Sequence, residues 1–232
     1  NIVYRINKRV AITKKVKNDL QLFYAENNID KMLSERIVVI NNKVTTPTTP
    51  PVKNFSEPLK ILFVGRPDKV KRIHLIGKIA QQLYSTRKIQ IDLIGPDLEK
   101  EIDEKNKSFI NFKGVITNAV QLNEEYNKAH IILIVSVREG LPMVIMEGMA
   151  LGVVPICTNV GALSEIISNS VNGFLINEKL NEDELVSRFF EIILRLDNDR
   201  ELLRRVSENA YSFAVENFSK TKFNSEYQKL LC

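Results

Sequence analysis

Residues 131–157, with the sequence IILIVSVREGLPMVIMEGMALGVVPIC, decide the fold. They open with the continuous apolar run Ile131–Val135, which is typical of a strand buried on both faces. Pro142–Leu151 is predicted to be a helix, because proline fits the first helical turn, where its missing N–H group does no harm. Val153–Cys157 is a second apolar run of strand length. A strand, a helix and a strand in this order predict a βαβ unit with parallel strands.

The same alternation continues on both sides of this unit. The expected strands are Lys60–Val64, Ile89–Ile94, Phe109–Phe112, Ile131–Val135, Val153–Cys157 and Gly173–Ile176. The expected helices are Val70–Ser85, Ala119–Lys128, Pro142–Leu151, Ala162–Ser168, Asn181–Arg195, Asp199–Glu216 and Phe218–Leu231. This order predicts an α/β fold with a doubly wound, Rossmann-like parallel sheet. Ligands of such sheets bind beyond the carboxyl ends of the strands, so the turns after the strands are the candidate site.

A proline- and threonine-rich segment separates this region from the start of the chain. Residues 45–58, TTPTTPPVKNFSEP, hold four prolines and four threonines. This composition favours extended backbone and indicates a linker. Before it, Arg5–Glu26 is predicted to be a helix and Arg36–Ile40 a short strand.

Composition narrows the class of protein. Of the 232 residues, 44% are hydrophobic and 26% charged, as in an ordinary soluble globular protein. The net charge of +5 suits an anionic ligand but is too small to indicate nucleic acid. No apolar run approaches the ~20 residues that cross a bilayer, and the first residues do not resemble a signal peptide. The two cysteines, Cys157 and Cys232, cannot form a metal cluster by themselves, and with only two histidines, His74 and His130, a site of three or more histidines is excluded. We expect a cytoplasmic protein and leave open a peripheral contact with the inner face of the membrane.

Two glutamates, Glu139 and Glu147, stand eight residues apart after the Ile131–Val135 strand. Eight helical residues span about 12 Å, which is comparable to the distance from a sugar, past a diphosphate, to a ribose. Carboxylates accept hydrogen bonds from sugar hydroxyls, and the helix start near Gly140 favours phosphate. The alternative interpretation is that Glu139 caps the helix and Glu147 faces solvent.

This segment resembles the E-x7-E motif of family-four glycosyltransferases, which are retaining enzymes of the GT-B fold. The matching residues are Ser136, Glu139-Gly140-Leu141-Pro142, Glu147-Gly148-Met149-Ala150, Gly152 and Val153-Val154-Pro155. The resemblance implies that Glu139 contacts the donor sugar and Glu147 the ribose of the nucleotide. It also implies that Gly140 and Leu141 face the sugar and the phosphates.

A second stretch, Phe63-Val64-Gly65-Arg66 followed by Lys71, resembles the strand, Gly-Arg and lysine of the same family. Two exposed cations at the carboxyl end of a strand can neutralise two phosphates and stabilise a departing diphosphate. The resemblance therefore implies that Arg66 and Lys71 act with Glu139 in catalysis and that Gly65 lies beside the donor. The family usually has glycine after the lysine, where this chain has Arg72. Lys69 is thus an alternative to Lys71, although the spacing favours Lys71. The other interpretation is a basic surface turn, which the joint match of the two motifs disfavours.

Three weaker matches follow other strands. Gly95 stands in the glycine turn after the second strand, and Val115 and Ile116 fall in the segment whose backbone lies beside the nucleotide base in the family. Thr158-Asn159-Val160-Gly161, followed by Glu165, resembles a further loop of the same crevice. We expect His130, at the edge of a buried strand, and Cys157, in an apolar run, to be structural.

The resemblance covers nearly all 232 residues but corresponds only to the second half of such an enzyme. It implies that residues 1–44 are a hinge and a remnant of an N-terminal domain and that 45–58 are the linker. Residues 59–217 would form the nucleotide-sugar-binding domain, and 218–232 a terminal helix that crosses towards the missing domain. The acceptor, a glycan or glycolipid, would bind through that missing domain.

The implied function is hexosyl-type transfer from a nucleotide sugar with retention, in polysaccharide biosynthesis, with no metal or other cofactor and with the fragment inactive alone. Asp197-Asn198-Asp199 has the metal-binding Asp-x-Asp pattern, but we interpret it as a turn and helix cap because it falls between two helices. The alternatives are a nucleotide-sugar 2-epimerase of GT-B fold and a non-catalytic nucleotide-sugar-binding module.

Overall fold

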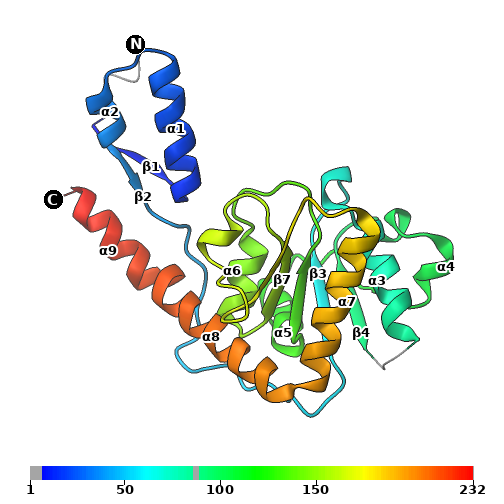
Figure 1. The fold of residues 1–232 in the computed structure, drawn as a ribbon. Coiled ribbons are helices and arrows are strands. Elements are labelled where there is room, and N and C mark those ends of the chain that lie inside the picture. Colours follow the sequence, from blue (N-terminus) through cyan, green and yellow to red (C-terminus); the bar gives the residue numbers. More distant parts are fainter. Residues whose placement is uncertain (1–6, 86–88, 232) are drawn as a thin grey trace.

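A six-stranded parallel sheet forms the centre of the protein in the computed structural model, which describes residues 7–85 and 89–231 (Figure 1). The strands follow the order β5-β4-β3-β6-β7-β8 across the sheet. They are β3 (Lys60–Val64), β4 (Gln90–Ile94), β5 (Asn111–Phe112), β6 (Ile131–Ile134), β7 (Val154–Thr158) and β8 (Phe174–Ile176). Counted from β3, this is the order 3-2-1-4-5-6 of a Rossmann sheet. The predicted α/β fold with a doubly wound sheet is confirmed.

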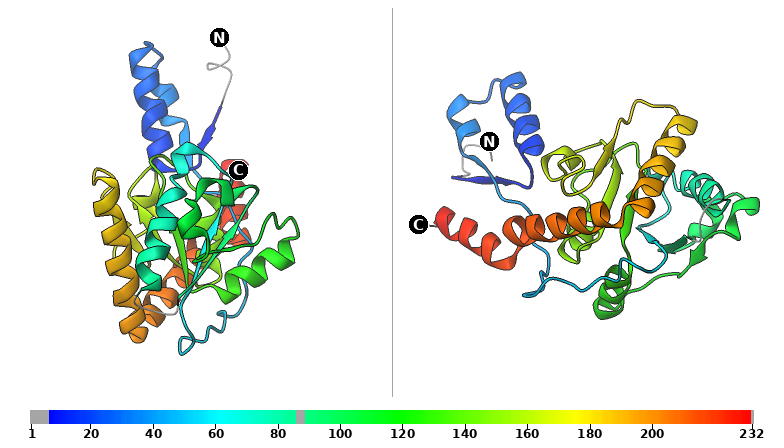
Figure 2. Two further views of the ribbon diagram at one scale, coloured as in Figure 1. Left: turned by 90° about the vertical axis from the view of Figure 1, so that its right-hand side faces the viewer. Right: turned by 60° about the horizontal axis from the view of Figure 1, so that its bottom comes forward.

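Helices cover both faces of this sheet (Figure 2). The helices and 3-10 turns after β3 are η2 (Lys69–Lys71), α3 (His74–Tyr84), η3 (Leu98–Glu101), α4 (Glu104–Lys107), α5 (Ala119–Lys128), α6 (Met143–Ala150), η4 (Leu163–Glu165), α7 (Glu182–Asn198), α8 (Arg200–Phe218) and α9 (Lys220–Leu231). Ile76 of α3 and Phe189 of α7 share a core with Phe63 of the sheet. Tyr126 of α5 and Met146 of α6 share a second core with Ile132 on the other face. Alternate strand residues therefore serve both cores.

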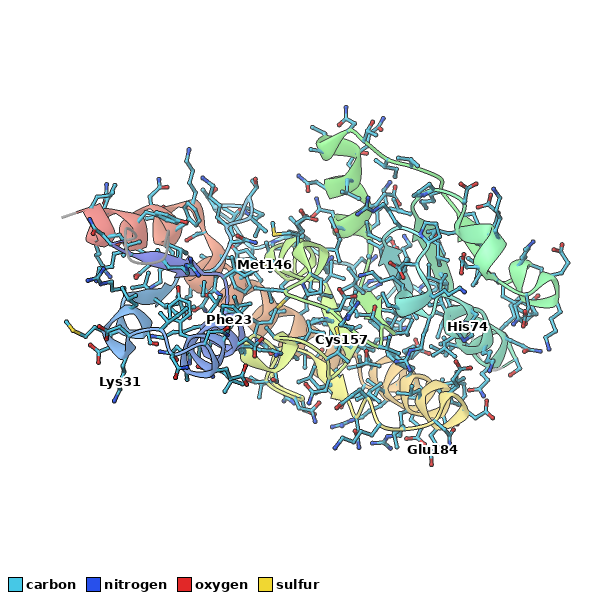
Figure 3. The ribbon with its side chains drawn as sticks, turned by 90° about the horizontal axis from the view of Figure 1, so that it is seen from above. Phe23, Lys31, His74, Met146, Cys157 and Glu184 are labelled. Carbon is cyan, nitrogen blue, oxygen red and sulfur yellow. The ribbon has the colours of Figure 1, made fainter. Side chains whose placement is uncertain are left out.

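A small separate unit precedes the sheet and contains β1 (Arg9–Ala11), α1 (Lys14–Glu26), α2 (Lys31–Glu35) and β2 (Ile37–Val39). Its strands pair in parallel, and its own core is Ala11, Tyr24, Leu33 and Ile37. Figure 3 shows Phe23 and Lys31 in this unit and Met146 and Cys157 in the main domain. The Glu165 carboxylate joins the two units, accepting hydrogen bonds from the backbone N–H groups of Lys14 at 2.7 Å and Lys15 at 2.6 Å.

Three helix predictions are corrected by the structure. Arg5–Glu26 is not one helix, since residues 9–11 pair with β2 and α1 begins only after Thr13, whose side chain caps it; residues 5 and 6 lie outside the described part. Val70–Ser85 is interrupted because Arg72 has a left-handed φ of +47°, so that α3 begins at His74. Ala162–Ser168 forms only the short turn η4. There the Asn172 side chain accepts a hydrogen bond from the Ser168 N–H and donates one to the Ile166 carbonyl. A longer helix would use both of these backbone groups.

The linker region contains neither helix nor strand, but it packs against the domain. The Lys53 ammonium donates hydrogen bonds to the carbonyls of Tyr126, Asn127 and Ala129, at 3.1, 3.1 and 2.6 Å. These carbonyls stand at the carboxyl end of α5, where backbone N–H partners within the helix run out; the Tyr126 carbonyl also accepts from the Ala129 N–H at 3.2 Å. Burial lowers the pKa of Lys53 to about 7. The sequence indicates an extended linker, but it does not show this attachment.

Candidate functional site

The topological switch point lies between the neighbouring strands β3 and β6, at their carboxyl ends. A cavity of about 470 Å³ opens there. The loop after β3 supplies Gly65 and Arg66, and the loop after β6 supplies Glu139. Lys71 of η2, the neighbouring Asp68 and the first residues of α6 also line it. The structure thus brings together at one cavity four residues that the sequence analysis singled out: Gly65, Arg66, Lys71 and Glu139.

Glu139 is a nearly buried acidic group of this cavity, with a side chain that is only 8% exposed. Its Oε1 accepts hydrogen bonds from Lys71 Nζ at 2.6 Å and from Ser136 Oγ at 2.6 Å. It does not cap the helix, because α6 begins at Met143, with Pro142 at the N-cap and no side-chain cap bond. Glu139 is therefore a nearly buried carboxylate that is paired with one cation at the carboxyl end of the sheet.

The structure distinguishes Lys71 from its neighbour Lys69. Lys71 lines the cavity and pairs with Glu139, whereas Lys69 is exposed and is absent from the lining. Arg66 is exposed at the cavity mouth. The backbone N–H of Val137 donates to the carbonyl of Val70 at 2.8 Å, which attaches the turn that carries Lys71 to the loop that carries Glu139.

Glu147 lies within α6, four residues after its first residue, Met143, and is half-buried rather than solvent-facing. Its Oε2 accepts a hydrogen bond from the Tyr126 hydroxyl at 3.0 Å. Burial, with the charge and hydrogen bond of Glu147, raises the pKa of Tyr126. Glu147 lines a second cavity of about 550 Å³ between α5, α6 and the chain near Lys43. Met143 lines both cavities, so the two spaces adjoin along one side of α6.

The loops after the strands are packed tightly against one another. A Cβ on Gly95 would lie 1.8 Å from the Gly65 carbonyl oxygen, and its φ is +154°, so only glycine fits there. The Gly95 N–H donates to the Gly114 carbonyl at 2.9 Å. Val115 is exposed and Ile116 half-buried just beyond, and neither lines the two cavities.

Gly140 and Leu141 differ in their surroundings. Leu141 is buried in the core, whereas Gly140 is exposed, and no atom lies within 4 Å of where its Cβ would be. The backbone of Gly140 does not have a positive φ either. Packing and backbone conformation therefore give no reason for glycine at this position. Neither residue lines the two cavities.

The remaining candidates for chemistry are structural. His130 is buried, accepting from the Lys60 N–H through Nδ1 and placing Nε2 3.2 Å from the Asn54 carbonyl. Cys157 is fully buried, and burial raises its thiol pKa. Asp199 caps α8 by accepting from the Leu202 N–H at 2.8 Å, as predicted for the Asp-x-Asp sequence.

Two further properties concern the described residues as a whole. Across residues 7–85 and 89–231, no three His, Cys, Asp or Glu side chains are grouped so that they could hold a metal ion. In the same part of the chain, each helix is too short or too polar to cross a membrane.

A Rossmann sheet with charged side chains in a cavity at its switch point has the architecture of the doubly wound α/β proteins that bind ligands at this place. The sequence matches the family described as glycosyl transferases group 1 over residues 46–213. The chain belongs to this family.

Individual relatives support this assignment. An uncharacterized glycosyltransferase of Methanocaldococcus jannaschii is 30% identical over 193 residues, covering 82% of this chain and 52% of the relative. The O-antigen biosynthesis glycosyltransferase WbnH of Escherichia coli is 26% identical over 189 residues, covering 79% and 51%. The chain therefore spans about half the length of these curated relatives.

Among solved structures, Alr3699/HepE of Anabaena in complex with UDP-glucose matches with a TM-score of 0.74 at 17% identity, covering 97% of this chain and 63% of that one. A TarM mutant of S. aureus in complex with fondaparinux, alpha-GlcNAc-glycerol and UDP matches with a TM-score of 0.77 at 19% identity, covering 98% and 44%. At these identities the likeness shows the fold.

Proposed function

We propose that this chain is the donor-binding half of a retaining glycosyltransferase of GT-B fold that uses a nucleotide sugar. The observation that carries the proposal is the Lys71–Glu139 pair in the switch-point cavity, with Arg66 at its mouth. Cations there suit a diphosphate, and a carboxylate beside them suits sugar hydroxyls. The shared border of the two cavities at Met143 provides room for a ligand with a sugar end and a nucleoside end.

Donor binding changes the partners of the pair. Without a ligand, Lys71 and Glu139 neutralise each other at 2.6 Å. A diphosphate competes for the Lys71 ammonium, and Glu139 is then available to accept hydrogen bonds from the donor sugar. As the bond between sugar and diphosphate breaks, Arg66 and Lys71 stabilise the negative charge that develops on the leaving group. We propose that these protein cations serve the diphosphate without a required metal ion.

The acceptor and its setting are part of the same proposal. WbnH is named for O-antigen biosynthesis, and the TarM complex contains alpha-GlcNAc-glycerol with UDP. These names support a growing glycan or glycolipid as the acceptor, and we propose no role for nucleic acid. We place the reaction in the cytoplasm, with a peripheral contact at the inner face of the membrane, and propose that residues outside this chain bind the acceptor.

The direct test is calorimetric titration of the 232-residue chain with UDP, GDP and ADP. We expect one of them to bind at millimolar concentration or below, which corresponds to about 4 kcal/mol or more of binding free energy. An absence of heat from all three, with the fold confirmed by circular dichroism, would overturn the proposal.

Substitution of the two glutamates should weaken the binding of different ligands. Glu147→Ala is expected to weaken binding of the nucleoside diphosphate and of the nucleotide sugar alike, because Glu147 is proposed to contact the ribose, which both ligands contain. Glu139→Ala should weaken mainly binding of the nucleotide sugar, because Glu139 is proposed to contact the donor sugar. Loss of a hydrogen bond to a charged group costs about 1.5–3 kcal/mol, which is roughly tenfold or more in affinity. Titration of both variants with both ligands measures this, and equal losses throughout would contradict the two roles. Glu104→Ala, which changes an exposed carboxylate outside both cavities, serves as the control.

Gly140 allows folding and binding to be separated. Gly140→Ala should leave thermal stability unchanged, because its Cβ would enter open space at a backbone conformation that alanine adopts. The same methyl group should obstruct a sugar nucleotide that approaches this backbone, and we expect roughly tenfold weaker binding, about 1.4 kcal/mol. The matched control is Gly161→Ala, whose Cβ would lie 2.1 Å from the Glu139 carbonyl oxygen and should lower the melting temperature. Unchanged affinity in Gly140→Ala would remove Gly140 from the donor site.

A further inference from the structure

Arg72 adopts a backbone conformation that its side chain does not favour. Its φ is +47°, in the left-handed region, where residues other than glycine are uncommon. The residue ends the turn η2 directly after Lys71 and precedes the first turn of α3. An arginine in this conformation needs compensation from its surroundings.

The Arg72 guanidinium provides that compensation through contacts across the switch point. Its Nε donates to the Val135 carbonyl at 2.7 Å and its Nη2 to the Ser136 carbonyl at 3.2 Å. The fork of the guanidinium thus fixes two successive carbonyls at the end of β6. A lysine or a glycine could not reproduce both contacts.

The carbonyls that Arg72 holds belong to the loop that carries Glu139. The Ser136 hydroxyl donates to Glu139 Oε1, and the Ser136 carbonyl also accepts from the Thr158 hydroxyl at 2.6 Å. Lys71, the neighbour of Arg72, donates to the same Glu139 oxygen. Arg72 and Lys71 therefore contact the same short loop from the same turn. Arg72 bonds to backbone carbonyls of the loop, and Lys71 bonds to the Glu139 carboxylate of the loop.

We propose that Arg72 is a positioning residue that sets Lys71 and Glu139 at the distance and orientation required by the diphosphate end of the donor. The inference rests on the proposed function and assigns to this site a residue that contacts no ligand. If the Arg72 fork is removed, the turn that carries Lys71 keeps the Val137–Val70 backbone bond but loses both side-chain bonds to the β6 end.

The test uses Arg72→Gly, because glycine accepts a left-handed φ without strain and the substitution removes only the side-chain contacts. Whichever of UDP, GDP and ADP binds the unaltered chain is titrated, with its monophosphate, into the 232-residue chain and the variant; UDP and UMP stand for that pair below. We expect UDP to bind about tenfold more weakly to Arg72→Gly, the size of one lost charge-assisted hydrogen bond. UMP lacks the second phosphate and should change by no more than about twofold, well under one such bond. Lys69→Met, in the same turn but outside the cavity, is the control for lost positive charge.

A double-mutant cycle with Lys71→Met separates positioning from general destabilisation. If Arg72 acts through Lys71, then Arg72→Gly should cause no additional loss of UDP affinity in a Lys71→Met background. Additive losses, equal losses for UDP and UMP, or an undiminished affinity of Arg72→Gly would each overturn the inference.

Should Arg72→Gly fail to fold, Arg72→Lys replaces it in the cycle, with a smaller UDP-selective loss expected because an ammonium lacks the fork. If the unaltered chain binds UDP but Arg72→Gly binds it equally well, only the role of Arg72 fails. If the unaltered chain binds neither UDP, GDP nor ADP, the proposed function fails and the inference with it.

Discussion

Sugar transfer by the 232-residue chain alone should be undetectable, even where donor binding is intact. Every residue that we propose to contact the donor lies between Gly65 and Glu147. None of the described residues is assigned to binding the acceptor hydroxyl. Positioning of a second reactant can lower a barrier by about 7–11 kcal/mol, so its loss should bring transfer below detection. Donor binding does not depend on that positioning and should persist.

The measurement is transfer of radiolabelled sugar from a nucleotide sugar to a glycolipid extract of the host. The 232-residue chain is assayed beside any longer product of its gene, with nucleotide binding recorded for both. Equal transfer by the two proteins would show that the acceptor site lies within this chain and that our division of the protein is wrong. Transfer by the longer protein only, with equal nucleotide affinity, is the expected result.

The sheet could be predicted from the sequence because each strand is marked by its own residues. Ile131–Val135 is apolar throughout, and the structure buries it fully between two helical layers. The short strand β1 has no such mark, since Arg9–Ala11 becomes a strand only through its pairing with Ile37–Val39. Likewise, the apolar spacing after Val70 is helical, but the left-handed Arg72 delays the helix to His74. Tertiary contacts that oppose local pattern account for these errors.

The site could be predicted in part for a related reason. Parallel strands bring their carboxyl ends to one side of the sheet. The turns that carry Arg66, Lys71 and Glu139 therefore lie close together, however many residues separate them in the sequence. The partners of these residues are less visible. Tyr126 approaches Glu147 from another helix, and no sequence pattern links the two. Ser136 precedes Glu139 by three residues, a local signal from which their hydrogen bond could have been anticipated.

His130 shows how a buried structural residue makes stability depend on pH. The Lys60 N–H donates to Nδ1, so the neutral ring carries its proton on Nε2 and donates it to the Asn54 carbonyl. A second ring proton would have no acceptor in this arrangement. Burial, aided by the positive charges of Lys53, Arg200 and Lys60, lowers the pKa of His130 to about 4. The carbonyl of Asn54 opposes this shift without cancelling it.

We therefore expect the fold to lose stability as the pH falls below neutrality. In the unfolded chain His130 takes up its proton near pH 6.5, the ordinary histidine value, while the folded chain resists protonation down to about pH 4. The unfolded state thus binds more protons between these values, so stability is fully present above pH 6.5 and is lost as the pH falls through 4. The expected loss from this group is about 3 kcal/mol.

Urea unfolding at pH 7, 5.5 and 4.5 measures this loss, and His130→Gln isolates it. Glutamine can accept from one backbone group and donate to another, but it does not titrate. Carboxylates whose pKa is lowered by lysine partners, such as Glu125, contribute to acid unfolding in both proteins and cancel in the difference. We expect the variant to be less stable than the unaltered chain at pH 7 and to lose markedly less stability on acidification. Direct NMR titration of the His130 ring gives the folded-state pKa, and a value near 6.5, or equal pH dependence in the two proteins, would show that the buried ring accepts its second proton without cost to the fold.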